Sequence, residues 1–116
     1  MTRTIFLLIL LNISFGDLIG QTRTIDSLWS LYHNYSKFDS HTVDIINEIA
    51  EQFVLINSDS ADVLAKEAYE ESDQLSYNRG LGKALEIRGK VQHDYGNYEK
   101  AEEFFKQSLS KYKKAN

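Results

Sequence analysis

The stretch "GNYEKAEEFF", Gly96 to Phe105, decides the fold class. It opens with the pair Gly96-Asn97, which is typical of a turn. It then places Ala101 and Phe105 at a spacing that puts both on one side of a helix. The stretch is therefore expected to be the middle of a helical hairpin, in which a turn leads directly into the second helix.

The rest of the chain shows the same helical periodicity and no alternating strand pattern. Further helices are expected around Trp29, from Val43 onward, after the turn cluster at Asn57, and ahead of Gly96. The chain contains no proline, which favours uninterrupted helices because proline removes a backbone donor. The fold class is therefore expected to be all-α, with five helices and no sheet.

Two details of packing also follow from the pattern. Gly80 and Gly82 are expected to loosen the junction before the fourth helix. The last helix is expected to turn one stripe toward the core, and this stripe consists of Tyr98, Ala101, Phe105, Ser108, Leu109 and Tyr112.

Two of the helix pairs look alike. Ala50 and Gly89 lie midway through the first helix of each pair, and Ala61 and Ala101 lie early in the second. Ala61 and Ala101 are forty residues apart, within the range that marks a repeat array. Small residues let antiparallel helices approach closely, and Phe105 is expected to pack into the following helix. A hairpin this small buries its apolar face by stacking on a neighbour.

The second pair resembles the tetratricopeptide repeat. The matching residues are Gly89, Gly96, Tyr98, Ala101, Phe105 and Leu109, whereas Arg88, Gln92 and Ser108 depart from the pattern. The upstream pair matches more loosely. The resemblance implies antiparallel helical hairpins stacked as a short tetratricopeptide-type solenoid, with an unrelated antiparallel bundle as the alternative. The expected parts are a capping helix at about 25–36 and repeats at about 43–76 and 81–113.

The N-terminus has the pattern of a secretory signal. Arg3 precedes an apolar run from Ile5 to Ile13, and small residues follow. Cleavage is expected after Gly16 or Gly20. An uncleaved anchor is the alternative, but Asp17 interrupts the run before the ~20 apolar residues that a span needs. We expect a signal segment at 1–20 and an exported, periplasmic or extracytoplasmic repeat domain at 21–116.

The order of these parts resembles exported bacterial sensor proteins. In such proteins, helical repeats precede a membrane span and a histidine kinase or DNA-binding regulator module. The resemblance implies a protein–protein interaction module, the extracytoplasmic repeat region of a signalling protein, which meets the membrane only through a downstream segment. The alternative is a free-standing exported scaffold with no effector domain, and the reading frame after Asn116 separates the two.

No constellation of catalytic residues is evident. His33, His41 and His93 are isolated, the chain has no cysteine, and it has no glycine-rich phosphate loop. Residues 74–116 hold nine basic and five acidic residues, and their lysines alternate with glutamates. Such a surface does not favour nucleic acid. We expect neither an enzyme nor a cofactor or metal site.

Binding is the remaining function. By the resemblance, one helix of each pair lines the concave side, and its exposed positions contact a protein or peptide. These positions are Asp44, Asn47, Glu51, Lys83, Glu86, Lys90 and His93, each with plain solvated surface as the alternative. The last helix is expected to leave part of its apolar stripe open to water, which makes self-association through this C-terminal helix a second expected contact.

Overall fold

The computed structural model describes residues 24–116, and the predicted signal segment lies outside them. Over the described residues the chain forms five helices and no strand, which confirms the all-α class. A first helix covers residues 24–34. It is followed by α2 (Ser40–Phe53), α3 (Ser58–Gln74), α4 (Asn78–Asp94) and α5 (Tyr98–Ala115).

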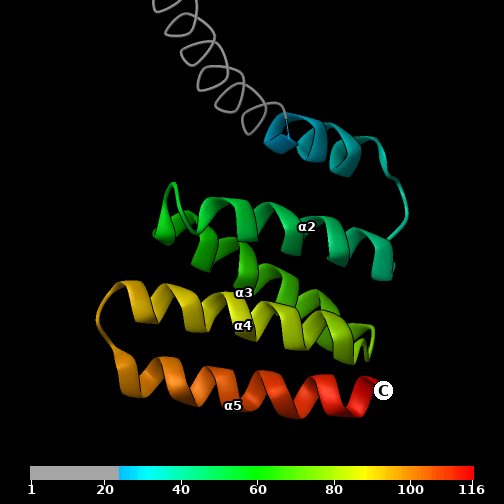
Figure 1. Cartoon of the computed structure of the whole chain (residues 1–116). Coiled ribbons are helices and arrows are strands. Elements are labelled where there is room, and N and C mark those ends of the chain that lie inside the picture. The colour runs from blue at the N-terminus through cyan, green and yellow to red at the C-terminus, as the bar shows by residue number, and fades with distance from the viewer. Residues whose placement is uncertain (1–23) are drawn as a thin grey trace, which may run out of the picture.

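The helices are stacked in chain order (Figure 1). α2 packs on α3, α3 on α4 and α4 on α5, and α2 also contacts α4. Short turns join each helix from α2 through α5 to the next, so that neighbouring helices run in opposite directions. The contact between α2 and α4 brings together two helices that are not consecutive in the chain.

Side-chain caps fix the starts of α2 and α3. Asp39 accepts hydrogen bonds from the backbone N–H groups of His41 and Thr42, at 3.0 and 3.3 Å. The Thr42 hydroxyl accepts in return from the Asp39 N–H, which completes a capping box. Asn57 accepts from the Ser60 N–H at 3.1 Å at the start of α3. Each cap satisfies N–H groups that have no partner within the helix.

The turns before α4 and α5 have the same backbone conformation. Ser76 and Gly96 both have positive φ, 53° and 81°. In each turn the next N–H bonds back to the preceding helix, from Tyr77 to the Ser72 carbonyl at 2.8 Å and from Asn97 to the Gln92 carbonyl at 2.9 Å. A residue of positive φ thus ends each of the two preceding helices. Glycine is the most common residue at such a position, because it lacks a Cβ atom.

The core is made of isoleucines facing alanines. α2 contributes fully buried isoleucines such as Ile46 and Ile49, whereas the apolar residues that α3 buries are all alanines. Leu28, from helix 24–34, packs with Ile45 and Ile49. The first helix thus covers one side of α2, and the small α3 side chains let α2 and α4 approach each other.

The expectation that Gly80 and Gly82 loosen a junction is wrong, because α4 begins at Asn78 and both lie buried inside it. A Cβ atom at Gly80 would lie 2.8 Å from Cγ1 of Val43, and one at Gly82 would lie 3.0 Å from the ring of Tyr112. Neighbouring helices therefore use these positions for close approach.

The expected inner stripe of α5 is only partly correct. Ala101 and Ser108 are buried, but Tyr98 is 64% exposed and Leu109 is 55% exposed. Phe105 does not pack into a following helix. A Cβ atom at Gly89 of α4 would lie 2.5 Å from its ring, so the ring covers that glycine on the preceding helix. One flank of α5 is left uncovered among the described residues.

Candidate partner-binding surface on α2 and α4

α2 and α4 together carry a compact group of charged side chains, which we call the α2–α4 charge network. The Glu51 carboxylate of α2 forms ion pairs with two lysines of α4. Lys83 Nζ lies 3.1 Å from Oε2 of Glu51, and Lys90 Nζ lies 2.5 Å from Oε1. Glu86 lies between these lysines, 3.6 Å from Lys83 and 3.4 Å from Lys90. Two glutamates and two lysines thus share one surface.

The spacing of the α4 residues explains this geometry. Glu86 follows Lys83 by three positions and precedes Lys90 by four, and such residues lie on the same side of a helix. Glu51 is near the end of α2, where it faces this side of α4. The Tyr112 hydroxyl donates to Oε2 of Glu86 at 2.9 Å, so the network also connects to α5.

Electrostatics stabilise the charged forms within the network. Burial alone would raise the pKa of Glu51, but hydrogen bonds and charges from Lys90 and Lys83 outweigh it and lower the pKa. Burial likewise opposes the charge on Lys90, whose pKa is nevertheless raised, because Glu51 and Glu86 stabilise the ammonium. The network has no net charge, and its side chains are 30–36% exposed. Charged side chains of a bound protein would therefore have to replace these internal ion pairs, because the network holds no isolated charge to neutralise.

The other three predicted site residues lie outside these ion pairs. Asp44 accepts a hydrogen bond from the Tyr77 hydroxyl at 2.8 Å. His93 is exposed in the last turn of α4, where its ring meets that of Tyr98 edge-on, with 5.2 Å between centroids. Asn47 was expected to be exposed, and this is wrong. It is 2% exposed, and its Nδ2 donates to the Gly80 carbonyl at 3.2 Å.

Two tyrosines of this surface were missed by sequence reasoning. Burial, followed by the hydrogen bond to Asp44, raises the pKa of Tyr77 to about 12. Burial and the bond to Glu86 also raise the pKa of Tyr112. No spacing rule identifies these partners, because each tyrosine reaches a carboxylate on another helix. The only sign in the sequence is that each tyrosine lies near the end of a helix, from where it can reach the exposed face of a neighbouring helix.

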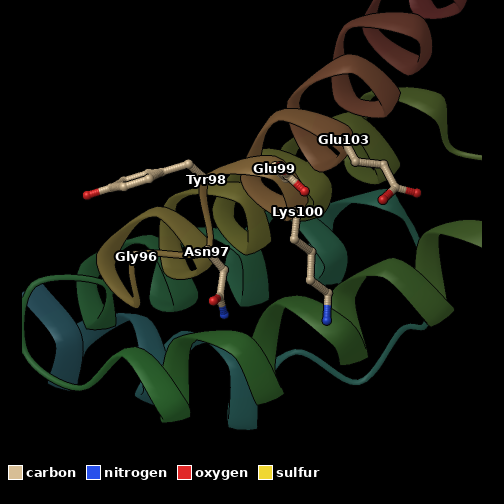
Figure 2. Close-up of a pocket in the computed structure, with 6 residues that line it drawn as sticks. All are labelled: Gly96, Asn97, Tyr98, Glu99, Lys100 and Glu103. Atoms are coloured by element: carbon tan, nitrogen blue, oxygen red, sulfur yellow. The ribbon is translucent and has the colours of Figure 1, made fainter.

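A surface hollow at the turn before α5 offers no comparable arrangement. It is lined by consecutive residues of the turn and first helical turn together with Glu103, all of them exposed. Figure 2 shows the side chains of Tyr98, Lys100 and Glu103 pointing in different directions. Such a hollow encloses no ligand.

Residues 24–116 contain neither a metal-ligand cluster nor a membrane-spanning helix. No group of three histidine, cysteine, aspartate or glutamate side chains in this part of the chain could hold a metal ion. None of its helices is both long enough and apolar enough to cross a membrane.

Comparison with known proteins returns no relative. No protein-family model, no curated protein and no solved structure matches the chain. We therefore infer a function from the arrangement of the residues described above and from the resemblance in sequence pattern.

Proposed function

We propose that this chain is a protein-binding module, a short tetratricopeptide-type solenoid whose partner lies along α2 and α4. The observation that carries the proposal is the α2–α4 charge network. It gathers Glu51, Lys83, Glu86 and Lys90 from two non-consecutive helices on one surface. In a solenoid of this type, the first helix of each hairpin faces the partner, and α2 and α4 are those helices.

The partner we propose is a protein segment with both acidic and basic side chains. Such a segment can replace the internal ion pairs one by one, so that no half-buried charge is left without a counter-charge. Pairs of this kind contribute little net affinity each, ~1 kcal/mol or less when exposed. Binding should therefore be specific in register and moderate in strength, and it should weaken as salt increases.

We further propose that the module belongs to the extracytoplasmic part of a bacterial signalling protein. The support is the resemblance in the order of parts: a signal segment, a short helix and helical repeats. A free-standing exported scaffold remains the alternative, and both use the same α2–α4 surface.

Site-specific photo-cross-linking in the producing cells tests the binding surface. A photoreactive residue replacing Lys83 is expected to give a discrete adduct with another protein. The matched control replaces Lys66, an exposed lysine of α3, and should give no such adduct. Equal adducts from both positions, or none from either, would contradict the proposal.

Charge reversal provides a second readout of the same surface. Lys90→Glu places a carboxylate opposite Glu51, and it should reduce the adduct formed from position 83 by roughly tenfold. Lys106→Glu on α5 is the control, because the one ion pair of that lysine within residues 24–116 is with Glu102 of its own helix. An adduct that survives Lys90→Glu unchanged would place the partner elsewhere.

A further inference from the structure

One flank of α5 is apolar and uncovered among the described residues. It consists of Tyr98, Phe105 and Leu109, which are 64%, 38% and 55% exposed. Their spacing along the helix places them on one side. Exposed apolar residues that lie together, and are not scattered singly, are typical of protein–protein interaction sites.

The corresponding flank of α3 is covered by a helix. Forty residues separate Asp62 from Glu102 and Tyr69 from Leu109. Asp62 forms an ion pair with Arg88 of α4 at 3.1 Å, and Tyr69 packs against the buried cluster that includes Ala84 of α4. The flank of α5 that bears Glu102 and Leu109 is therefore built like one that accepts a helix in this same molecule.

The charges along α5 indicate which helix fits. Its first half carries Glu99, Glu102 and Glu103 together with Lys100 and Lys106, a net charge of −1, whereas its second half carries Lys111, Lys113 and Lys114, a net charge of +3. A helix that runs antiparallel on this flank needs the same order of charges, acidic then basic, in its own direction. α5 itself has that order, so two copies are mutually complementary.

We propose that α5 docks antiparallel on α5 of a second copy of this chain, around a two-fold axis near Gln107. Phe105 of one copy then packs against Leu109 of the other, and Glu102 of one faces Lys113 of the other. Both contacts occur twice because the interface is isologous. The docking goes beyond the proposed partner binding, since it uses α5 and leaves the α2–α4 charge network accessible.

The first test is sedimentation equilibrium of the chain purified after expression from its complete reading frame. A reversible dimer with a micromolar Kd is expected, because the contact is small. Leu109→Asp should weaken it at least a hundredfold. Val63→Asp is the matched control, an apolar residue of α3 that is 66% exposed, and it should leave the Kd unchanged. A monomer at all concentrations, or equal effects of the two variants, would overturn the proposal.

The second test is a charge swap, which distinguishes antiparallel self-docking from binding to another protein. Glu102→Lys and Lys113→Glu should each weaken the dimer roughly tenfold. The two changes in one chain should restore the original Kd, because each altered residue again meets its opposite charge. A double variant at least as weak as the worse single variant would overturn the antiparallel register. Circular dichroism of each variant confirms that the helices are retained, and cross-linking at position 83 reports separately on the α2–α4 surface.

Discussion

The hairpins α2–α3 and α4–α5 achieve close packing with opposite distributions of side-chain volume. In the first, Ala50 of α2 and Ala65 of α3 lie in one buried cluster. In the second, the corresponding positions hold Gly89 and Phe105, and the aromatic ring covers the glycine. Volume is shared between the helices in one hairpin and concentrated on the second helix in the other.

Side-chain volume is also divided differently at the other end of the two hairpins. The second hairpin pairs Gly82 with the ring of Tyr112. The first has Val43 and Ser72 at the corresponding positions, both fully buried. The comparison shows that matched positions can carry unlike residues, because a pair of small residues leaves space that a third helix fills, as Ile87 of α4 does beside Ala50 and Ala65, whereas a glycine admits an aromatic ring from its partner helix.

The largest expected effect comes from filling the glycine of the second hairpin. Gly89→Leu adds a side chain where even a Cβ atom would lie 2.5 Å from the Phe105 ring. We expect the free energy of unfolding to fall by about 3 kcal/mol, measured by urea denaturation followed by circular dichroism. Val63→Leu, at an exposed position, should change it by less than about 0.5 kcal/mol. Equal stabilities for the two variants would mean that the ring does not rest on Gly89.

A double-mutant cycle converts the pair Gly89 and Phe105 of the second hairpin into a pair of alanines like that of the first. Gly89→Ala alone should destabilise by about 1 kcal/mol, since the clash exceeds the gain in helix propensity. In the Phe105→Ala background the same change should stabilise by about 1 kcal/mol, because the pair then resembles Ala50 and Ala65. A coupling energy near zero in the cycle would mean that the Phe105 ring does not limit the size of the side chain at position 89.

A smaller effect on stability is expected from removing the charge of Glu51, which connects the first hairpin to the second. Glu51→Gln should cost about 1 kcal/mol at pH 7. The pKa of Glu51 is lowered from 4.5, so its stabilising effect is present above pH 4.5 and is lost as the pH falls through the lowered pKa. Stability measured against pH should therefore show the two proteins converging in acid. A difference that persists unchanged at about pH 2 would assign the effect to packing instead of charge.

The smallest expected effect compares the two left-handed turns. Ser76→Gly should stabilise by about 0.5–1 kcal/mol, because a serine Cβ strains the positive φ of 53°. Gly96→Ser should destabilise by a similar amount, at a φ of 81° with no heavy atom within 4 Å of the added Cβ. Thermal melts of both variants measure the difference. Shifts of the same sign would mean that the two turns are not equivalent.

Helical periodicity predicted the helices and the turn at Gly96, because these depend on residues close in sequence. It did not predict that Asn47 is buried or that Phe105 lies on Gly89, since each depends on which helix lies opposite. Four of the seven predicted site residues meet in the α2–α4 charge network. Their positions on α4 followed from helical spacing, whereas the contact with Glu51 required knowing that α2 and α4 lie side by side.

The side-by-side placement of α2 and α4 is the central claim, and chemical cross-linking tests it most directly. The chain has no cysteine, so Glu51→Cys and Lys90→Cys introduce the only two thiols. A short bis-maleimide should join them within one molecule in high yield. The control pair Glu51→Cys and Lys106→Cys, with its second thiol on the exposed surface of α5, should remain unlinked. Efficient linkage of positions 51 and 90 supports the account, and failure to link them in a folded, helical protein would contradict it.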